Sequence, residues 1–227
     1  DISSICGEFK MIYGSWFRNK MEKPIPGYEA YQKIDAGMGL YNKYSAESEV
    51  TLLYKGEVIS EDSFKENRYC VEIFGKKVKE IGNNCFNRCR NLKKVFLPKV
   101  TKIGHNCFSN CEIIKSIKLP QAIYIGNGAF SGCSELTEIS DLNIIKASTS
   151  LFGYCRKLEK ISLPKATEID YYAFEACSSL KFLSIPSATE LKNGCFGGCD
   201  KLQEIKYERQ SKRSFETGWC IALYKYK

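Results

Sequence analysis

A pattern of 22 residues recurs along most of this 227-residue chain and constrains its fold more than any other feature. Phenylalanine marks the pattern at Phe86, Phe108, Phe130, Phe152, Phe174 and Phe196. Cysteine follows each phenylalanine three residues later, at Cys89, Cys111, Cys133, Cys155, Cys177 and Cys199. A fixed period of this length predicts a solenoid, in which each repeat is one supersecondary unit that stacks on the next.

Within one repeat the spacing of the apolar residues changes. Between Gly126 and Leu136 they fall at steps of three and four, which predicts a short helical turn with one side facing inward. Leu158, Ile161 and Leu163 then frame a short strand in which Ile161 points inward and its neighbours point outward. A proline ends this strand in several repeats, because it lacks the N–H that a ladder needs, at Pro98, Pro120, Pro164 and Pro186.

The Ile-Gly pair before each helical turn predicts a corner of the coil. We expect Gly82, Gly104 and Gly126 to form a left-handed or tight turn, which glycine adopts without steric cost. Each coil is therefore predicted to run through strand, corner, helical turn and return. One coil alone cannot bury both of its apolar sides, so each coil needs its neighbours for stability.

The pattern Ile-Gly-x-x-(Ala/Cys)-Phe-x-x-Cys-x-x-Leu-x-x-Ile-x-Leu-Pro resembles the BspA-like class of leucine-rich repeat, over about residues 56 to 207. The resemblance implies a leucine-rich repeat solenoid of parallel strands and short helical turns. It also implies adhesion-type recognition, with host matrix or cell-surface proteins among the partners. Fold alone does not fix a ligand.

The period divides the chain into three parts. Residues 1–55 do not follow it, and we expect an N-terminal cap over the open end of the solenoid, or alternatively a small domain with its own ligand. Residues 56–207 form about seven coils, beginning with a degenerate coil that places Phe64 in the phenylalanine position. Residues 208–227 are predicted to be a C-terminal cap with a closing strand from Gly218 onward.

The N-terminal part has its own local patterns. Apolar residues at helical steps from Phe9 to Phe17 predict a helix, and a second helix is expected from Tyr28 to about Met38. Residues 50–54 are typical of a strand.

One coil in the middle departs from the pattern. Asp141 and Leu142 replace the usual Leu-Pro, and Ala147 stands where an isoleucine is expected. An aspartate would be costly to bury unpaired. We therefore expect a local bulge that turns Leu142 inward, either as a tolerated irregularity or as a device that re-aims side chains.

Twelve cysteines would ordinarily indicate disulfides or metal sites. The repeat argues against both, because Cys85, Cys107 and Cys195 share their position with Ala129 and Ala173. A position that accepts alanine is one for a small buried side chain, which a free thiol fills well. We therefore expect no metal and few disulfides, with Cys6 and Cys220 the remaining candidates for reactive or bridging thiols.

Charge and motifs favour neither a nucleic-acid partner nor catalysis. The net charge of +8 is spread over the chain, whereas nucleic-acid proteins show a basic stripe with aromatic residues between. The single histidine, His105, stands in a turn position that is asparagine in other coils, so it is expected to be exposed. No nucleophile elbow, phosphate loop or zinc motif is present. We expect a protein that is not an enzyme and has no cofactor.

Residues beside each inward isoleucine should form columns on one exposed sheet. One column is Lys94, Ser116, Glu138, Lys160, Phe182 and Glu204, and the next is Phe96, Lys118, Ser140, Ser162, Ser184 and Lys206. Exposed aromatic residues are candidate anchors for a partner, although a single surface phenylalanine is also common. From these columns we predict a partner-binding site formed by Lys94, Phe96, Lys118, Lys160, Phe182 and Lys206.

The leading hypothesis is a recognition or adhesion module at a cell surface or in a secreted protein, with a protein partner or a glycan. No apolar stretch reaches the length of a membrane helix, and no leader precedes Asp1, so any leader is expected to lie outside this sequence. The alternative is a cytoplasmic interaction scaffold. The many free thiols fit the exterior of an anaerobe or a cytosol.

Overall fold

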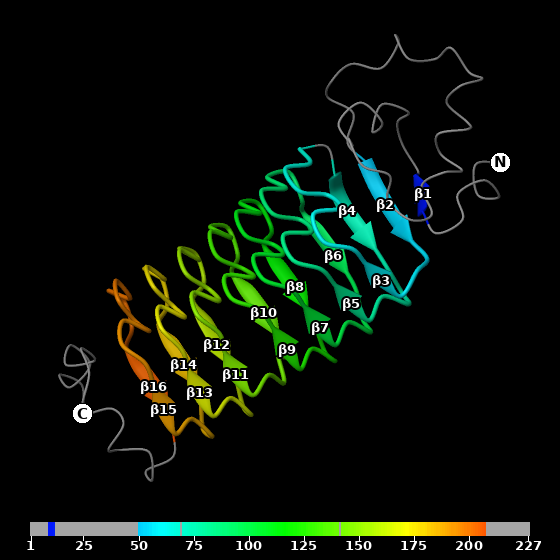
Figure 1. Ribbon diagram of the computed structural model, residues 1–227. Coiled ribbons are helices and arrows are strands. Elements are labelled where there is room, and N and C mark those ends of the chain that lie inside the picture. The colour runs from blue at the N-terminus through cyan, green and yellow to red at the C-terminus, as the bar shows by residue number, and fades with distance from the viewer. Residues whose placement is uncertain (1–8, 12–49, 69, 141, 208–227) are drawn as a thin grey trace, which may run out of the picture.

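The computed structural model describes residues 9–11, 50–68, 70–140 and 142–207, whose coils stack side by side into an elongated solenoid (Figure 1). The expected leucine-rich repeat architecture, with about seven coils and a 22-residue period, is confirmed. The described residues form sixteen strands and no helix: β1 (Phe9–Met11), β2 (Val50–Tyr54), β3 (Val58–Ile59), β4 (Cys70–Phe74), β5 (Glu80–Ile81), β6 (Lys94–Phe96), β7 (Lys102–Ile103), β8 (Ser116–Lys118), β9 (Tyr124–Ile125), β10 (Glu138–Ser140), β11 (Lys146–Ala147), β12 (Lys160–Ser162), β13 (Glu168–Ile169), β14 (Phe182–Ser184), β15 (Glu190–Leu191) and β16 (Glu204–Lys206).

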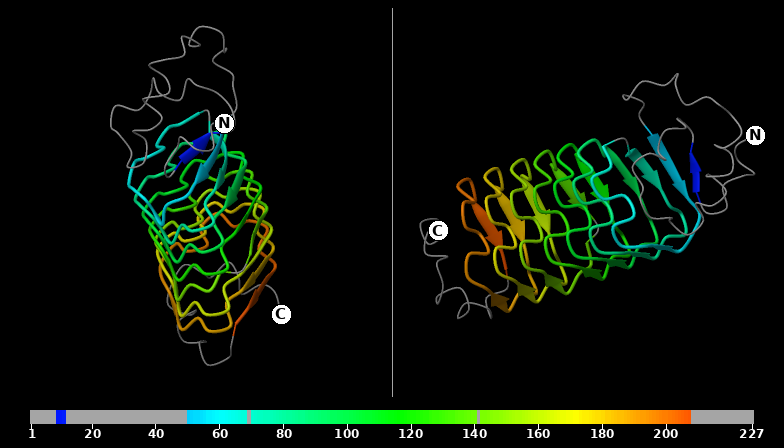
Figure 2. Two further views of the ribbon diagram at one scale, coloured as in Figure 1. Left: turned by 90° about the vertical axis from the view of Figure 1, so that its right-hand side faces the viewer. Right: turned by 45° about the horizontal axis from the view of Figure 1, so that its top comes forward.

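Two ladders of parallel strands run along the stack. The longer strands pair in the order β2-β4-β6-β8-β10 and β12-β14-β16, and the short strands pair as β3-β5-β7-β9 and β11-β13-β15. The pairing places residues 22 positions apart opposite each other, as in Ile139 with Ile117 and Ile161 with Leu183. Figure 2 shows the short strands along a different side of the stack from the longer strands.

The N-terminal end differs in part from expectation. The predicted strand at residues 50–54 is confirmed as β2, which pairs with β4 and so continues the longer ladder. Residues 9–11 form β1, antiparallel to β2, so the predicted helix is wrong at these positions, where pairing with β2 determines the backbone. The predicted helix from Tyr28 to Met38 and the C-terminal cap at 208–227 lie outside the described residues.

The helical turns expected in each coil are not formed. In their place, backbone N–H groups donate to the neighbouring coil. The N–H groups of Asn84 and Phe86 donate to His105 O and Cys107 O of the next coil, both at 2.8 Å. Positive φ angles at Asn84 (51°) and Arg88 (58°) turn the chain so that these bonds can form. Successive turns therefore reproduce the inward spacing of a helix without its hydrogen bonds.

The corner glycines are needed for close packing rather than for left-handed backbone. A Cβ at Gly82 would lie 2.3 Å from the backbone N of Glu61 in the preceding coil, and one at Gly104 would lie 2.5 Å from the N of Asn83. Neither glycine has a positive φ, so of the two expected alternatives, a left-handed or a tight turn, the left-handed one is wrong. The positive φ angles of glycine lie within the turns instead, at Gly128, Gly132, Gly194 and Gly198.

Later corners hold polar residues that bond across the coils. Ser148 donates its hydroxyl to Ile125 O at 2.6 Å. The Asp170 carboxylate is buried and accepts hydrogen bonds from the Tyr171 N–H at 2.9 Å and the Thr149 hydroxyl at 2.8 Å. It also lies 3.1 Å from Lys146 Nζ. Burial raises the pKa of Asp170, but these hydrogen bonds and the Lys146 charge outweigh it, so the pKa lies below its ordinary value.

The predicted column of phenylalanines is confirmed as the spine of the core. The rings from Phe64 to Phe174 are at most 1% exposed. Each ring stacks on the next, with centroids 5.2 to 5.8 Å apart from Phe64 to Phe196. Phe64 stacks on Phe86, which confirms that the degenerate first coil is in register.

The cysteine three residues after each spine phenylalanine forms a hydrogen bond to the preceding coil. In the invariant position, each thiol donates to the carbonyl of the phenylalanine in the preceding coil, as Cys89 Sγ does to Phe64 O at 2.9 Å and Cys133 Sγ to Phe108 O at 3.2 Å. The ten cysteines from Cys70 to Cys199 are free. Burial raises the pKa of Cys89 and Cys133 to about 12, so these thiols are protonated and unreactive at neutral pH.

Both ladders are interrupted at the irregular coil. The strands β10 and β12 belong to separate sheets, and so do β9 and β11. Leu142 is 2% exposed, which confirms that it turns inward, and Ala147 is also buried. Asp141 itself lies outside the described residues. The core continues across the interruption, because Phe130 and Phe152 stack with their centroids 5.7 Å apart.

Candidate binding face

The outward residues of the longer strands form one exposed face, which we call the strand face. In β12, for example, Ile161 is buried while Lys160 and Ser162 are exposed, as the alternation of a strand requires. The six residues predicted from sequence are all exposed on this face: Lys94, Phe96, Lys118, Lys160, Phe182 and Lys206. Their exposure agrees with the register inferred from the 22-residue period, and their role in binding stays a prediction.

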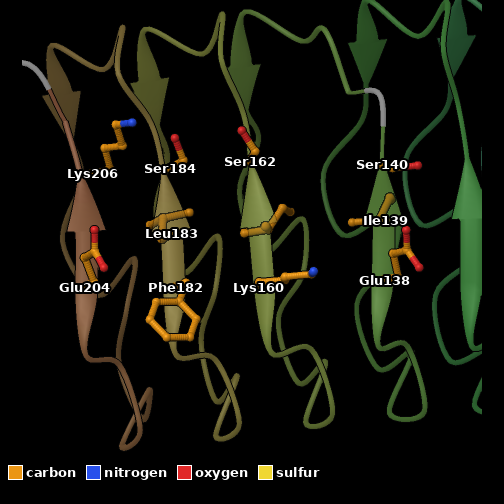
Figure 3. Close-up of a pocket in the computed structure, with 11 residues that line it drawn as sticks. Glu138, Ile139, Ser140, Lys160, Ser162, Phe182, Leu183, Ser184, Glu204 and Lys206 are labelled. Atoms are coloured by element: carbon orange, nitrogen blue, oxygen red, sulfur yellow. The ribbon is translucent and has the colours of Figure 1, made fainter.

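A depression of about 380 Å³ lies on the C-terminal half of the strand face, and we call it the strand-face hollow (Figure 3). It extends over β10, β12, β14 and β16. Its lining residues are Glu138, Ile139, Ser140, Lys160, Ile161, Ser162, Phe182, Leu183, Ser184, Glu204 and Lys206. Three of the predicted residues, Lys160, Phe182 and Lys206, therefore come together in the hollow. The other three lie on β6 and β8, outside it.

The side chains of the hollow form three rows across the strands (Figure 3). The lower row in the figure is Glu138, Lys160, Phe182 and Glu204, and the upper row is Ser140, Ser162, Ser184 and Lys206. Between them lies an apolar floor of Ile139, Ile161 and Leu183, each at most 5% exposed. Phe182 is 45% exposed and stands in register between Lys160 and Glu204.

Several charged residues of the solenoid form ion pairs, but those of the hollow do not among the described residues. On the N-terminal half of the strand face, Lys94 Nζ lies 2.7 Å from a Glu72 carboxylate oxygen in the preceding coil. Most other ion pairs also join neighbouring coils, as between Lys157 and Glu135 at 2.7 Å. Among the described residues, no ion pair includes the four charged residues of the hollow, Glu138, Lys160, Glu204 and Lys206. These four groups are therefore available to a ligand.

The exposed aromatic residues of the strand face lie in different settings. Phe96 pairs with Phe74 of the preceding coil, with ring centroids 6.0 Å apart and planes at 42°. Phe182 instead has a lysine and a glutamate as its neighbours in the row. Sequence reasoning selected Phe182, Lys160 and Lys206 but left out the glutamates and serines of the same columns. The sequence already indicated these glutamates and serines, because they occupy equivalent positions in neighbouring coils.

His105 has a structural setting. It is exposed, its N–H donates to Asn83 Oδ1 at 2.9 Å, and its Nδ1 accepts from the Asn127 N–H at 3.0 Å. The side chain thus continues an asparagine-type bridge between coils. Within the described ranges, no three His, Cys, Asp or Glu side chains gather to hold a metal ion. The same residues contain no helix that is long and apolar enough to cross a membrane.

Comparison with known proteins agrees with this architecture. A family model described as BspA type leucine-rich repeat region, in six copies, matches residues 57–166 and 146–218. A leucine-rich repeat protein from Bacteroides ovatus ATCC 8483 is 28% identical, with a TM-score of 0.55 over 67% of this chain and 49% of the other. This chain therefore spans about half of that protein's length. None of the curated proteins matches.

A second solved structure shares the fold at lower identity. The T. pallidum leucine-rich repeat protein (TpLRR) is 20% identical, with a TM-score of 0.59 over 75% of this chain and 90% of the other.

Proposed function

Because this chain belongs to the BspA-type leucine-rich repeat family, we propose that it is a non-enzymatic recognition module whose strand face binds a protein partner at a cell surface or outside the cell. Proteins of leucine-rich repeat families are generally protein-interaction modules and typically not enzymes. The proposed contact residues are those predicted from sequence: Lys94, Phe96, Lys118, Lys160, Phe182 and Lys206.

The strand-face hollow is the observation that carries this proposal. Protein interfaces place aromatic anchors in a desolvated centre and polar groups at the rim. Phe182 stands beside an apolar floor, and the charges of Lys160 and Glu204 flank it without ion-pair partners among the described residues. A stable interface needs about 800 Å² on each partner. The strand face continues beyond the hollow to Phe96, so it offers additional area to a partner.

A binding experiment with a combined variant tests the proposal. The change is Lys94→Ala, Phe96→Ala and Phe182→Ala together, measured by biolayer interferometry against a panel of purified extracellular-matrix proteins. We expect the wild type to bind a member of the panel and the combined variant to lose that binding with an unchanged melting temperature, because all three side chains are exposed. Tyr124→Ala is the matched control, since Tyr124 is 46% exposed on the short-strand ladder.

Three results would contradict the proposal. If the combined variant binds as the wild type does, the strand face is not the contact surface. If it unfolds, the three side chains are not exposed as described. Should no protein of the panel bind the wild type, the assignment to an extracellular partner is wrong.

The second candidate function is an intracellular interaction scaffold with the same binding face. The observation in its favour is the set of ten free cysteines, since structural thiols are commonly oxidised in aerobic extracellular proteins. Protease treatment of intact cells of the source organism, followed by immunodetection, separates the candidates. Loss of the intact chain supports the surface location, and full protection supports the scaffold.

A further inference from the structure

The strand-face hollow also contains groups that indicate the chemistry of a ligand. Its upper row presents three hydroxyls, at Ser140, Ser162 and Ser184, before it ends at Lys206. A serine hydroxyl both donates and accepts hydrogen bonds, as a sugar hydroxyl does. The lower row adds the carboxylates of Glu138 and Glu204, which accept strong, charge-assisted hydrogen bonds from hydroxyl donors. Polar groups therefore border the hollow on two opposite sides.

The centre of the hollow suits an apolar ring face. Ile161 and Leu183 form the floor, are 4% and 2% exposed, and are held in position by the core beneath them. Phe182 stands beside this floor, with nearly half of its surface exposed. A pyranose ring has the matching distribution, because its C–H groups form an apolar face and its hydroxyls project around the edge. Small-ligand sites combine apolar walls with a few placed polar groups in the same way.

The spacing of the rows suits a linear chain that crosses the strands. The paired strands β12, β14 and β16 lie about 4.8 Å apart, so along them each row offers one side chain at each such step. A pyranose unit in a linear glycan advances the chain by a similar distance. Such a chain would place one sugar unit over each of β12, β14 and β16 and would extend toward β10, with hydroxyls directed toward both polar rows.

A peptide strand matches the hollow less well. The strand β14 at the centre of the hollow is paired with β12 on one side and β16 on the other, and Ser184 O accepts from the Leu163 N–H at 2.8 Å. A peptide that lies over β14 therefore cannot bind by adding a strand to the sheet, because strand addition needs an unpaired edge. The two glutamates and two lysines cancel in charge, so the hollow does not select for a peptide of either sign. These groups suit an uncharged ligand with many hydroxyls.

We propose that the strand-face hollow binds a linear, uncharged oligosaccharide that lies across β10, β12, β14 and β16, with one pyranose ring against Phe182. This inference deepens the proposed function and rests on it, because it assigns a saccharide to one part of the same face. The saccharide belongs either to a free polysaccharide or to a glycan on a protein partner.

The test is calorimetric titration of the full chain with hexasaccharides of the cello-, malto-, xylo- and chito- series and with their monosaccharides. We expect one series to bind, with its monosaccharide at least about tenfold weaker, because one unit contacts fewer of the strands. Phe182→Ala should weaken binding at least about tenfold through the lost ring contact. Tyr124→Ala is the matched control, since Tyr124 is 46% exposed on β9, outside the strand face, and it should bind as the wild type does.

A second variant keeps the test decisive. Glu204→Ala removes a rim carboxylate and should also weaken binding, whether or not Phe182→Ala folds. The inference is overturned if no series binds at millimolar concentration, or if Tyr124→Ala weakens binding as much as Phe182→Ala. It is also overturned if a matrix protein binds through Phe182 equally well after enzymatic deglycosylation, and in that case the proposed protein-binding function stands. Loss of binding on deglycosylation places the saccharide on the partner.

Discussion

Truncation of Phe130 tests the stacked spine directly. Phe130 is 1% exposed and lies between Phe108 and Phe152, with ring centroids 5.5 and 5.7 Å away. We expect Phe130→Ala to lower the free energy of unfolding by about 3–5 kcal/mol, the usual loss for a buried phenylalanine. Part of this loss is the two ring contacts, at about 0.5–1.5 kcal/mol each.

The end of the spine provides a matched comparison. Phe196 has the same side chain but is only partly buried, and among the described residues it stacks on one ring, Phe174, at 5.8 Å. Because less apolar surface is buried, we expect Phe196→Ala to cost roughly half as much as Phe130→Ala. The difference between the variants depends on position in the stack, since a solenoid's stability is approximately a sum of contacts between neighbouring repeats.

Urea denaturation followed by far-ultraviolet circular dichroism measures both losses. Should Phe130→Ala leave no folded protein, Phe130→Leu, which keeps most of the side-chain volume, should remain measurable with a loss of roughly 1–2 kcal/mol. A loss below about 1 kcal/mol for Phe130→Ala, outside the usual range for a buried ring, would refute the buried spine. Equal losses for Phe130→Ala and Phe196→Ala would refute the dependence on stacking from both sides.

Two further predictions concern polar contacts between coils. Cys133→Ala should cost about 0.5–1.5 kcal/mol more than Cys107→Ala in the same urea assay, because Cys133 Sγ donates to Phe108 O at 3.2 Å, whereas the Cys107 thiol donates to no carbonyl within the described part of the chain. Equal losses would contradict this role of the thiol. The folded pKa of Asp170 lies below its unfolded value of about 3.9, so its stabilising contribution is present above that pH and is lost as the pH falls through the folded pKa. Thermal melts below about pH 4 should therefore show a smaller fall in stability for Asp170→Asn than for the wild type, and an identical fall would contradict the assignment.

The register of the solenoid could be predicted because the 22-residue period determines which residues of neighbouring coils lie opposite each other. Once Phe86 and Phe108 occupy equivalent positions, Ile73 must lie opposite Val95, and the structure pairs these two residues. The same arithmetic put Phe96 and Phe182 on the exposed face. Periodicity thus fixes which side chains point inward and which outward, without knowledge of their contacts.

Periodicity does not determine the local backbone. Steps of three and four residues have the spacing of a helix, but successive turns with positive φ at Asn84 and Arg88 bring the same side chains inward. The choice depends on hydrogen bonds to the next coil, which a single repeat does not reveal. For the same reason, the glycine at Gly104 suggested a left-handed turn, although the contact with Asn83 of the preceding coil is what requires it.

The strand-face hollow could be predicted only in part for a related reason. Columns of exposed residues follow from the period, but a hollow depends on how neighbouring side chains differ in size. The small Ser162 and Ser184 beside the larger Phe182 and Lys160 help to shape it. The choice of anchors from residue type alone therefore included Phe96 and omitted Glu204.

The thiol of each invariant cysteine gives the stack a direction. Cys89 reaches back to Phe64, and every later coil reaches back to its predecessor in the same way. The first coil has Asn67 in this position, whose Oδ1 accepts from its own coil at the Cys70 N–H. If a whole coil is removed at the C-terminal end, every remaining thiol therefore keeps its carbonyl acceptor. If the first coil is removed, Cys89 loses its acceptor. Addition or removal of whole coils should therefore disturb these hydrogen bonds least at the C-terminal end of the solenoid.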